Sequence, residues 1–217
     1  MSIEQARFNM IEQQIRPWDV LDQGVLSLLA VVKREDFVPA EHRAKAFFDT
    51  EIPLGHGQFM LAPRVEARFL QELDVRKHER VLEIGTGSGY MAALLAHKAR
   101  EVVSVEVQPE LAKAAIANLR RASITNAVVL EGDASKGLPT QGPFDVIVLS
   151  GSVAAVPKAL LAELKVGGRL IAIVGQEPVM RATIVTRVGE QEFRNVEVFD
   201  TVAPRLSGFD EPSRFTF

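Results

Sequence analysis

The sequence predicts an α/β protein of Rossmann-like type, with a mostly parallel seven-stranded sheet, a C-terminal antiparallel hairpin and an N-terminal helical extension. Three observations support this fold class. From residue 76 onward, short β-branched runs alternate with longer amphipathic segments, as in βα units that build a parallel sheet. A glycine-rich turn at 85–89 joins the first such run to an amphipathic segment. Two β-rich runs near the C-terminus are separated by three residues, 189–191.

Length and composition predict one ordinary globular domain. The chain has 217 residues, of which 47% are hydrophobic and 24% are charged, and these fractions are close to globular averages. That length is sufficient for one buried core and short for two domains of ordinary size. We therefore expect a single domain, 1–217, in which residues 1–75 form the helical extension and residues 76–217 form the Rossmann-like core.

The N-terminal extension is predicted to be mainly helical. Apolar residues recur at helical spacing over 2–15, and Pro17 ends this helix because a residue before proline avoids the helical conformation. A second helix begins at Asp22, a suitable N-cap, and ends before the charged run 33–36. Proline and glycine repeatedly interrupt 49–63, which predicts a loop, and a short helix is expected over 63–73.

In the core, strands and helices are predicted to alternate along the chain. The strands are expected at 80–84, 101–105, 127–131, 144–149 and 169–174, and the helices at 89–98, 109–122 and 157–164. The C-terminal runs 181–188 and 192–199 are predicted to form the hairpin that completes one edge of the sheet.

Charge and cysteine content exclude several classes of function. The formal net charge is −3, so the chain has no general electrostatic attraction to nucleic acid or to anionic membranes. It has no cysteine, which excludes disulfides and thiolate metal sites, and no pair of histidines has metal-ligand spacing. The N-terminus lacks a signal-peptide core, and no run reaches the ~20 apolar residues of a membrane span. We therefore expect a cytoplasmic protein without a metal site.

A glycine-rich turn after the first predicted strand marks a candidate cofactor site. Glycines let the backbone turn sharply and pass close to a ligand, and the following helix offers free N–H groups. Dinucleotide-binding turns favour the spacing G-x-G-x-x-G, in which the helix start cradles a pyrophosphate. Here the spacing is G-x-G-x-G, preceded by an acidic residue, which is typical of S-adenosylmethionine methyltransferases. The residues are Glu83, Ile84, Gly85, Thr86, Gly87, Ser88, Gly89 and Tyr90.

Two acidic positions further along the chain fit the same ligand. Glu106 follows the next predicted strand, about 20 residues beyond Gly85, where a carboxylate can accept hydrogen bonds from both ribose hydroxyls. Gly132, Asp133 and Ala134 follow the third strand, where the acid can accept from an adenine amino group and the alanine leaves room for the ring. Glu106 or Asp133 alone would fit a solvated strand end equally well. The ordered set of three signals favours S-adenosylmethionine.

With these motifs in view, the chain resembles the protein-L-isoaspartate O-methyltransferase family over nearly its whole length. Besides the cofactor turn, 33–39 is similar to the family's N-terminal segment and 52–58 to its substrate-side loop. The segments 144–148 and 164–170 are similar to later motifs that many methyltransferases share. The resemblance implies an S-adenosylmethionine-dependent enzyme that methylates isoaspartyl carboxylates in damaged proteins, which permits repair through a succinimide. Its implied partner is a protein or peptide with isoaspartyl sites.

The resemblance also implies roles for individual residues. Asp49, His56 and Gln58 are expected around the acceptor as positioning groups of the catalytic site, although the first two also fit solvated loop residues. A carboxylate acceptor needs no general base, because its pKa of about 4 leaves it ionised at neutral pH. The expected cofactor-binding residues are Glu83, Gly85, Thr86, Gly87, Ser88, Gly89, Tyr90, Glu106, Gly132, Asp133 and Ala134.

One segment departs from the family pattern. After the glutamine the family usually has Thr-Ile-Ser, whose hydroxyls help to hold the cofactor and the substrate carboxylate, whereas this chain has Phe59, Met60 and Leu61. A leucine side chain has no donor, and a buried carboxylate short of one donor loses ~1–3 kcal/mol of binding. The departure therefore predicts lower isoaspartyl activity than the family pattern would give, unless Arg205 supplies a replacement cation.

Three alternatives remain open from the sequence. Phe59, Met60 and Leu61 would line an apolar pocket, which favours a hydrophobic small-molecule acceptor. A module that binds the cofactor without turnover would keep the same glycine turn. An NAD-dependent oxidoreductase shares the architecture, but it predicts nicotinamide binding and no affinity for S-adenosylhomocysteine. The sequence leaves the oligomeric state open.

Overall fold

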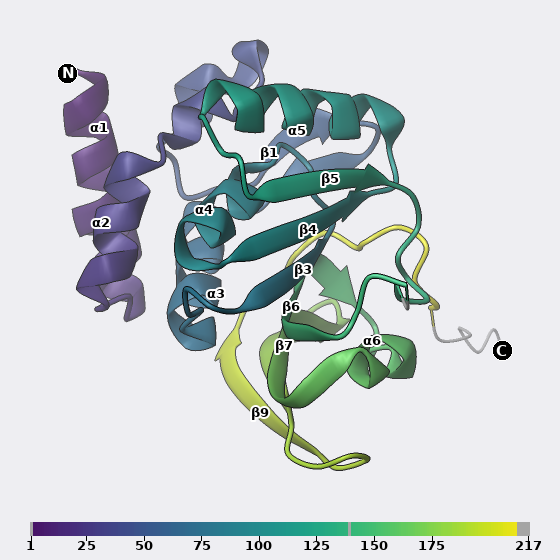
Figure 1. The fold of residues 1–217 in the computed structure, drawn as a ribbon. Helices are drawn as coiled ribbons and strands as arrows, with labels where there is room; N and C mark the ends of the chain where they lie inside the picture. The colour runs from purple at the N-terminus through teal and green to yellow at the C-terminus, as the bar shows by residue number, and fades with distance from the viewer. Residues whose placement is uncertain (1, 139, 212–217) are drawn as a thin grey trace, which may run out of the picture.

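One seven-stranded sheet runs through the centre of the protein (Figure 1). The computed structural model describes residues 2–138 and 140–211. The strand order is β5-β4-β3-β6-β7-β8-β9; strands β3 to β7 are parallel, and β8 and β9 join antiparallel at one edge, which confirms the predicted fold class. The strands are β3 (Arg80–Ile84), β4 (Glu101–Glu106), β5 (Ala127–Glu131), β6 (Phe144–Val153), β7 (Leu164–Gln176), β8 (Val179–Arg187) and β9 (Phe193–Asp200).

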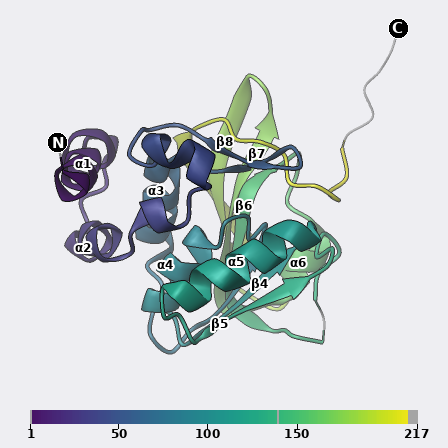
Figure 2. The ribbon, with the colours of Figure 1, turned by 90° about the horizontal axis from the view of Figure 1, so that it is seen from above.

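The central strands are apolar on both faces because helices cover both sides of the sheet. Successive residues of β3 belong to different cores: Val81 packs with the N-terminal helices, α3 (Pro63–Leu73) and α4 (Tyr90–Lys98), whereas Leu82 packs toward α6 (Lys158–Ala162). The helix α5 (Pro109–Arg121) lies against β4 and β5. Figure 2 shows α1 and α2 stacked outside α3 and α4.

The N-terminal extension is helical, as predicted, but its first segment is less regular than expected. It comprises α1 (Ile3–Asn9), the π-helical η1 (Met10–Ile15), η2 (Arg16–Trp18), α2 (Gln23–Val31), η3 (Arg34–Asp36) and η4 (Ala40–Lys45). Asp22 is the expected N-cap, because its carboxylate accepts from the backbone N–H of Val25 at 2.8 Å. The first segment does not end before Pro17. The proline stands in the short turn η2, where its missing N–H is tolerated, and Asp19, with φ 59°, ends the segment.

Two predicted boundaries in the middle of the chain are wrong. The expected loop 49–63 contains a hairpin of β1 (Ile52–Gly55) and β2 (Gln58–Met60), whose turn residues His56 and Gly57 have φ of 53° and 69°. Positive φ at two successive turn residues suits a tight hairpin, and a histidine in this conformation leaves little sequence signal. The expected helix 157–164 is also shorter, because Leu164 already pairs with Phe144 as the first residue of β7.

The strand order creates a crevice at the carboxyl end of β3. The chain passes from β3 to β4 and β5 on one side and then crosses to β6 on the other side, so the loops that follow β3 and β6 diverge. The register places Ile84 beside both Val105 and Leu149, and Glu106 beside Glu131. The glycine turn and the predicted acidic residues therefore emerge at one edge.

Among the described residues, no helix combines the length and apolar character needed to cross a bilayer.

Candidate cofactor and acceptor site

The glycine turn connects β3 to α4 with backbone conformations that side chains disfavour. Gly85 has φ 90°, and a Cβ atom there would lie 2.6 Å from Cδ2 of Leu206. Gly89 has φ 85°, serves as the N-cap of α4, and would place a Cβ 3.3 Å from the Cβ of Ala115. The backbone N–H of Gly85 donates to the Val105 carbonyl at 2.9 Å, which holds the turn against β4. The glycines are therefore required by conformation and by close packing.

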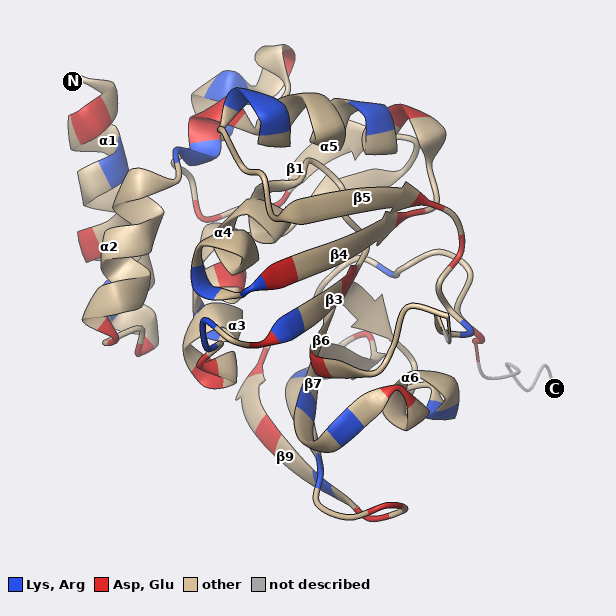
Figure 3. Ribbon diagram, viewed as in Figure 1, with Lys and Arg blue, Asp and Glu red and all other residues tan. Residues whose placement is uncertain are grey.

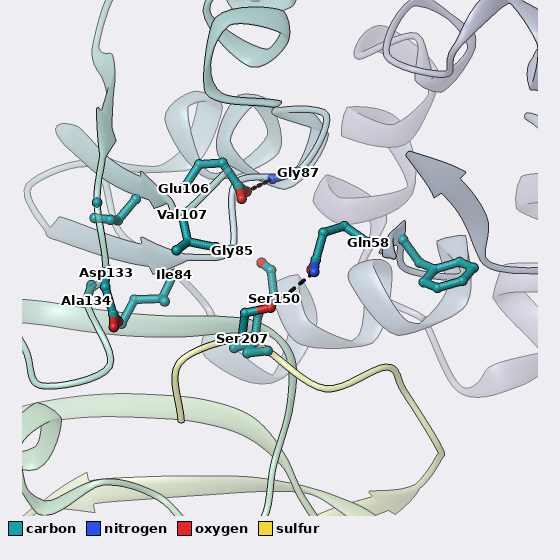
Figure 4. A pocket seen from close by; sticks show the side chains of 14 residues that line it. Gln58, Ile84, Gly85, Gly87, Glu106, Val107, Asp133, Ala134, Ser150 and Ser207 are labelled. Carbon is teal, nitrogen blue, oxygen red and sulfur yellow. Dashed lines mark hydrogen bonds between the residues drawn. The ribbon is translucent and has the colours of Figure 1, made fainter. Parts of the chain in front are cut away.

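A cavity lies directly beside this turn, at the carboxyl edge of the sheet (Figure 4). Eight of the predicted site residues line it: Gln58, Phe59, Gly85, Gly87, Glu106, Gly132, Asp133 and Ala134. Ile84, Val105, Val107 and Ser150 complete the wall on the sheet side, and Leu206 and Ser207 approach from the C-terminal segment. The structure thus brings together most of the expected nucleoside-binding residues.

Glu106 is the best-anchored acid of this cavity. Its side chain is buried, Oε2 accepts from the Gly87 N–H at 2.8 Å, and Oε1 accepts from the Gln108 N–H at 3.0 Å. Each carboxylate oxygen has two lone pairs, so both oxygens can still accept from a ribose hydroxyl. Asp133 is exposed, and its Oδ1 accepts from the Ser135 N–H at 2.8 Å, which orients the carboxylate at the opposite end of the cavity (Figure 4).

Four of the five remaining predicted cofactor residues line a second, smaller space beside the glycine turn. Glu83, Thr86, Ser88 and Tyr90 meet Phe59, Met60 and Leu61 there, together with Glu66 and Ser150. Glu83 is completely buried; its oxygens accept from Ser104 Oγ at 2.6 Å and from Ser150 Oγ at 2.8 Å. Tyr90 Oη is buried without a hydrogen-bond partner among the described residues. This space therefore holds polar groups that are suited to an amino acid moiety.

The burial of Glu83 predicts a pH dependence of stability. Burial raises the pKa of this carboxyl to about 8 from its ordinary 4.5, while the two serine hydroxyls lower it. The folded state thus keeps a proton that the unfolded state loses, so this stabilising contribution is complete below pH 4.5 and is lost as the pH rises to about 8.

We expect urea denaturation of the wild type to show a fall in the free energy of unfolding from pH 5 to pH 8, and a smaller fall in Glu83→Gln. An equal slope for the two proteins would contradict this assignment. Glu66, whose buried carboxyl has a pKa raised to about 7, keeps part of the slope in the variant.

Three predicted acceptor residues do not lie in the cofactor cavity. Asp49 forms an ion pair with Arg64, whose guanidinium lies 4.3 Å from the ring centroid of Trp18. His56 is exposed on the β1–β2 turn and faces a separate groove. Arg205 does not line the cavity: it donates to Ser152 Oγ at 3.2 Å and pairs with Glu211 at 2.7 Å.

Gln58 is the predicted positioning residue that the structure does place at the cavity. Its Nε2 donates to Ser207 Oγ at 3.1 Å, and Figure 4 shows this contact bridging the hairpin and the C-terminal segment. Phe59 is 40% exposed at the rim, whereas Met60 and Leu61 are buried.

Sequence reasoning missed several residues of the site. Ser104 and Ser150 hold Glu83, and a serine in each of two otherwise apolar strands was the available signal. Leu206 and Ser207 come from a segment with no motif, and their role depends on tertiary packing. The pair of Arg34 with Glu66 was also missed; both side chains are buried, and the arginine Nη2 donates to the Leu61 carbonyl at 2.7 Å.

The donor set fits S-adenosylmethionine. Glu106 and Asp133 offer acceptors for hydroxyl and amino groups at the cavity, and Glu83 offers a carboxyl for an amino group in the smaller space. The cavity has a volume of about 40 Å³, and Leu206 and Ser207 form part of its wall.

Comparison with known proteins agrees with the fold and with the resemblance to the family. A family model described as protein-L-isoaspartate(D-aspartate) O-methyltransferase matches residues 5–202. The protein-L-isoaspartate O-methyltransferase of Methanoculleus marisnigri is 43% identical over 169 residues, 78% of this chain and 77% of that protein. Protein-L-isoaspartate O-methyltransferase 2 of Marinobacter nauticus is 39% identical over 199 residues, 91% of each chain. A crystal structure from Plasmodium falciparum, in complex with S-adenosyl-L-homocysteine, shares the fold with a TM-score of 0.81 at 20% identity, covering 93% of this chain and 98% of that one.

The sheet order and the glycine turn, together with the family model and the curated relatives, identify an S-adenosylmethionine-dependent methyltransferase. The family match therefore excludes the alternative of an NAD-dependent oxidoreductase. The match over residues 5–202 and the 43% identity also identify the family within this class of enzymes. It belongs to the protein-L-isoaspartate(D-aspartate) O-methyltransferase family.

Proposed function

We propose that the protein methylates the side-chain carboxylate of isoaspartyl residues in damaged proteins. Family membership supports the reaction, and one structural observation carries the proposal for this chain: Gln58 and Phe59 face Glu106 and Asp133 across a single cavity. The acceptor-side hairpin and the donor-side acids are thus in reach of one another. Bound S-adenosylmethionine supplies an activated methyl group, so the protein has mainly to align donor and acceptor.

The proposed roles follow from the contacts of each residue. Glu106 binds the ribose hydroxyls, Asp133 the adenine amino group and Glu83 the amino group of the methionine moiety. Gln58 has two amide protons, of which one is donated to Ser207; the other can donate to an acceptor carboxylate. An ionised carboxylate is itself the nucleophile, so none of these residues has to remove a proton. We propose no contact with the reacting atoms for Asp49, His56 or Arg205, because none of them lines the cofactor cavity.

The domain division and the location form part of the same proposal. Residues 1–75 supply the acceptor-side hairpin, and residues 76–217 supply most of the cofactor contacts. One hydrophobic core includes Met10 and Leu29 of the first part with Val81 and Val146 of the second, which supports a single domain. We propose that the protein acts in the cytoplasm, where aged cytoplasmic proteins would be its substrates.

A second candidate keeps the cofactor and changes the acceptor. Phe59 forms the rim of the cavity with an exposed ring, and Leu61 stands where the family usually has a serine. An apolar rim favours an acceptor with a hydrophobic body. This alternative predicts methylation of an apolar small carboxylic acid and none of an isoaspartyl peptide.

The two candidates are separated by a methyl-transfer assay with matched peptides. One peptide contains isoaspartate, and its control has the same sequence with normal aspartate. We expect methylation of the isoaspartyl peptide alone. If S-adenosylhomocysteine binds but neither peptide is methylated, the proposed acceptor is wrong and the apolar acceptor is favoured.

Leu61 provides a sharper test of the acceptor side. Leu61→Ser adds a hydroxyl that can donate to the substrate carboxylate, whereas Leu61→Ala removes the same apolar bulk without adding a donor. We expect kcat/KM for the isoaspartyl peptide to be about tenfold higher in Leu61→Ser than in Leu61→Ala. One hydrogen bond to a charged group contributes ~1.5–3 kcal/mol, which is enough for a difference of this size. Equal values in the two variants would show that position 61 does not contact the acceptor.

A further inference from the structure

The smaller space around Glu83 has room for one small polar group. Its volume is about 20 Å³, which is enough for a group the size of a water molecule or an ammonium ion. It shares Gly85, Gly87 and Ser150 with the cofactor cavity, so a ligand bound in the cavity can extend one end into it. The groups that face this space therefore decide which kind of ligand end is accepted.

Two buried carboxyl groups from different elements face this space. Glu83 on β3 is 0% exposed, and Glu66 on α3 is 3% exposed. Burial is the main cause of the raised pKa of Glu83, and the carboxylates of Glu66 and Glu106 raise it further. Glu66 and Glu83 are therefore close enough to repel each other when both are ionised.

The arginine beside this space compensates only one of the two acids. Arg34 pairs with Glu66 and donates to the Leu61 carbonyl at 2.7 Å, so its guanidinium is already engaged. None of the described residues that line the space is a lysine, an arginine or a histidine. With both acids ionised, the cluster carries one uncompensated negative charge, which is costly when buried. Without a ligand, one of the two acids therefore keeps its proton.

Tyr90 gives independent evidence that the space receives a polar ligand group. Its side chain is 1% exposed and lines the space, and its Oη has no hydrogen-bond partner among the described residues. A buried hydroxyl without a partner costs free energy unless a ligand or a water molecule completes it. A phenolic oxygen can accept from an N–H group. The hydroxyl and the two acids therefore all fit a cationic N–H donor.

The edge of the sheet around this space is acidic as well. Figure 3 shows acidic positions near the carboxyl ends of β3, β4 and β5, which are Glu83, Glu106 and Glu131. Such an edge favours a cationic ligand group over an anionic one.

We propose that the α-ammonium group of the cofactor binds between Glu83 and Glu66, and that its entry drives one proton from this acid pair into solvent. The carboxylate that forms carries one negative charge, which the ammonium balances, so the buried cluster stays neutral. Glu66 Oε2 accepts from Arg34, and its Oε1 can accept from the ammonium. The inference rests on the proposed role of Glu83, and it adds a contact of Glu66 that no motif in the sequence predicts.

The test compares two ligands that differ only in the ammonium group. S-adenosylhomocysteine carries it, and the desamino analogue of S-adenosylhomocysteine keeps the carboxylate but lacks the amino group. Isothermal titration calorimetry at pH 7 in phosphate and in Tris, whose ionisation enthalpies differ, gives the number of protons released on binding. The α-amino group of the ligand is itself mostly protonated at this pH.

For the wild type we expect release of roughly one proton with S-adenosylhomocysteine and none with the desamino analogue. The affinity for S-adenosylhomocysteine should rise roughly tenfold from pH 6 to pH 7.5, because the ionised acid pair is the form that binds an ammonium. Burial, which raises the pKa of Glu83 to about 8 and that of Glu66 to about 7, sets this window. The affinity for the analogue should stay level.

Glu66→Gln tests the second acid, because it keeps an acceptor for Arg34 and removes the charge. We expect S-adenosylhomocysteine to bind roughly three- to tenfold more weakly, and the analogue to bind as it does to the wild type. Glu79→Gln is the matched control: Glu79 is also buried and paired with an arginine, Arg169, but it lines neither the cavity nor the smaller space. It should change neither affinity.

Equal proton release with the two ligands, or none with either, would overturn the proposal, and this comparison on the wild type does not depend on how the variants fold. Unchanged binding of S-adenosylhomocysteine to a folded Glu66→Gln would overturn the role of Glu66. If a proton is released but no isoaspartyl peptide is methylated, the ammonium site stands and the proposed acceptor is wrong.

Discussion

Glu106→Ala is expected to weaken S-adenosylhomocysteine binding by about two orders of magnitude or more. Two hydrogen bonds from hydroxyl groups to a carboxylate contribute ~1.5–3 kcal/mol each, and the substitution removes both. It also frees the Gly87 N–H, which Glu106 Oε2 accepts at 2.8 Å, so the glycine turn loses an anchor. Isothermal titration calorimetry of the purified variant measures the loss directly.

A matched control is available on the neighbouring strand. Glu131 pairs in register with Glu106, but its side chain is exposed and lines neither the cavity nor the smaller space around Glu83. Glu131→Ala should therefore bind S-adenosylhomocysteine like the wild type. If Glu106→Ala retained affinity within about threefold, its carboxylate could not hold the ribose, and the assignment of the cavity would fail.

Arg34→Met is expected to destabilise the protein by ~3–5 kcal/mol, because it leaves the buried carboxyl of Glu66 without its cation. Arg34 is 0% exposed; it pairs with Glu66, donates to the Leu61 carbonyl and lies 5.2 Å from the centroid of the Tyr90 ring. Burial already raises the pKa of Glu66 to about 7 even with this partner present. Urea denaturation at pH 8, where an unpaired Glu66 is most costly, gives the largest difference.

The double variant Arg34→Met with Glu66→Leu should regain most of the lost stability, since neither charge is then buried. Arg76→Met serves as the surface control: Arg76 and Asp74 form an ion pair with side chains 62% and 54% exposed, and its loss should change the free energy of unfolding by less than about 1 kcal/mol. If the double variant were no more stable than Arg34→Met, the loss would come from packing around the arginine rather than from the unpaired carboxyl.

The sequence predicted the sheet well because its strands are short apolar runs with helices between them. Strands buried on both faces cannot be replaced by another arrangement without exposing residues such as Val81 or Leu82. The positions of the glycine turn and of Glu106 at the sheet edge were predictable for a related reason. A close approach of backbone to ligand and a carboxylate at a strand end both require particular residues at particular spacings.

The acceptor side was less predictable because it depends on contacts between distant parts of the chain. Asp49 was expected near the acceptor; it pairs with Arg64 on α3 and does not line the cofactor cavity. Arg205 was expected as a replacement cation; it pairs with Glu211, donates to the buried Ser152 and does not line that cavity either. Only the fold decides which neighbour a long charged side chain meets. Local propensity does not contain that information.

The separation of donor and acceptor contacts along the chain bears on how such proteins diversify. The positions expected to bind the cofactor emerge from consecutive βα units between Glu83 and Ala134, whereas the opposing wall comes from the early hairpin at Gln58 and from the late segment at Ser207. Because both outer segments line the same cavity as Glu106 and Asp133, a mutation there is expected to change substrate range and methyl-donor affinity together. Leu61 and Phe59 are examples, since both lie after Gln58 and line the space around Glu83.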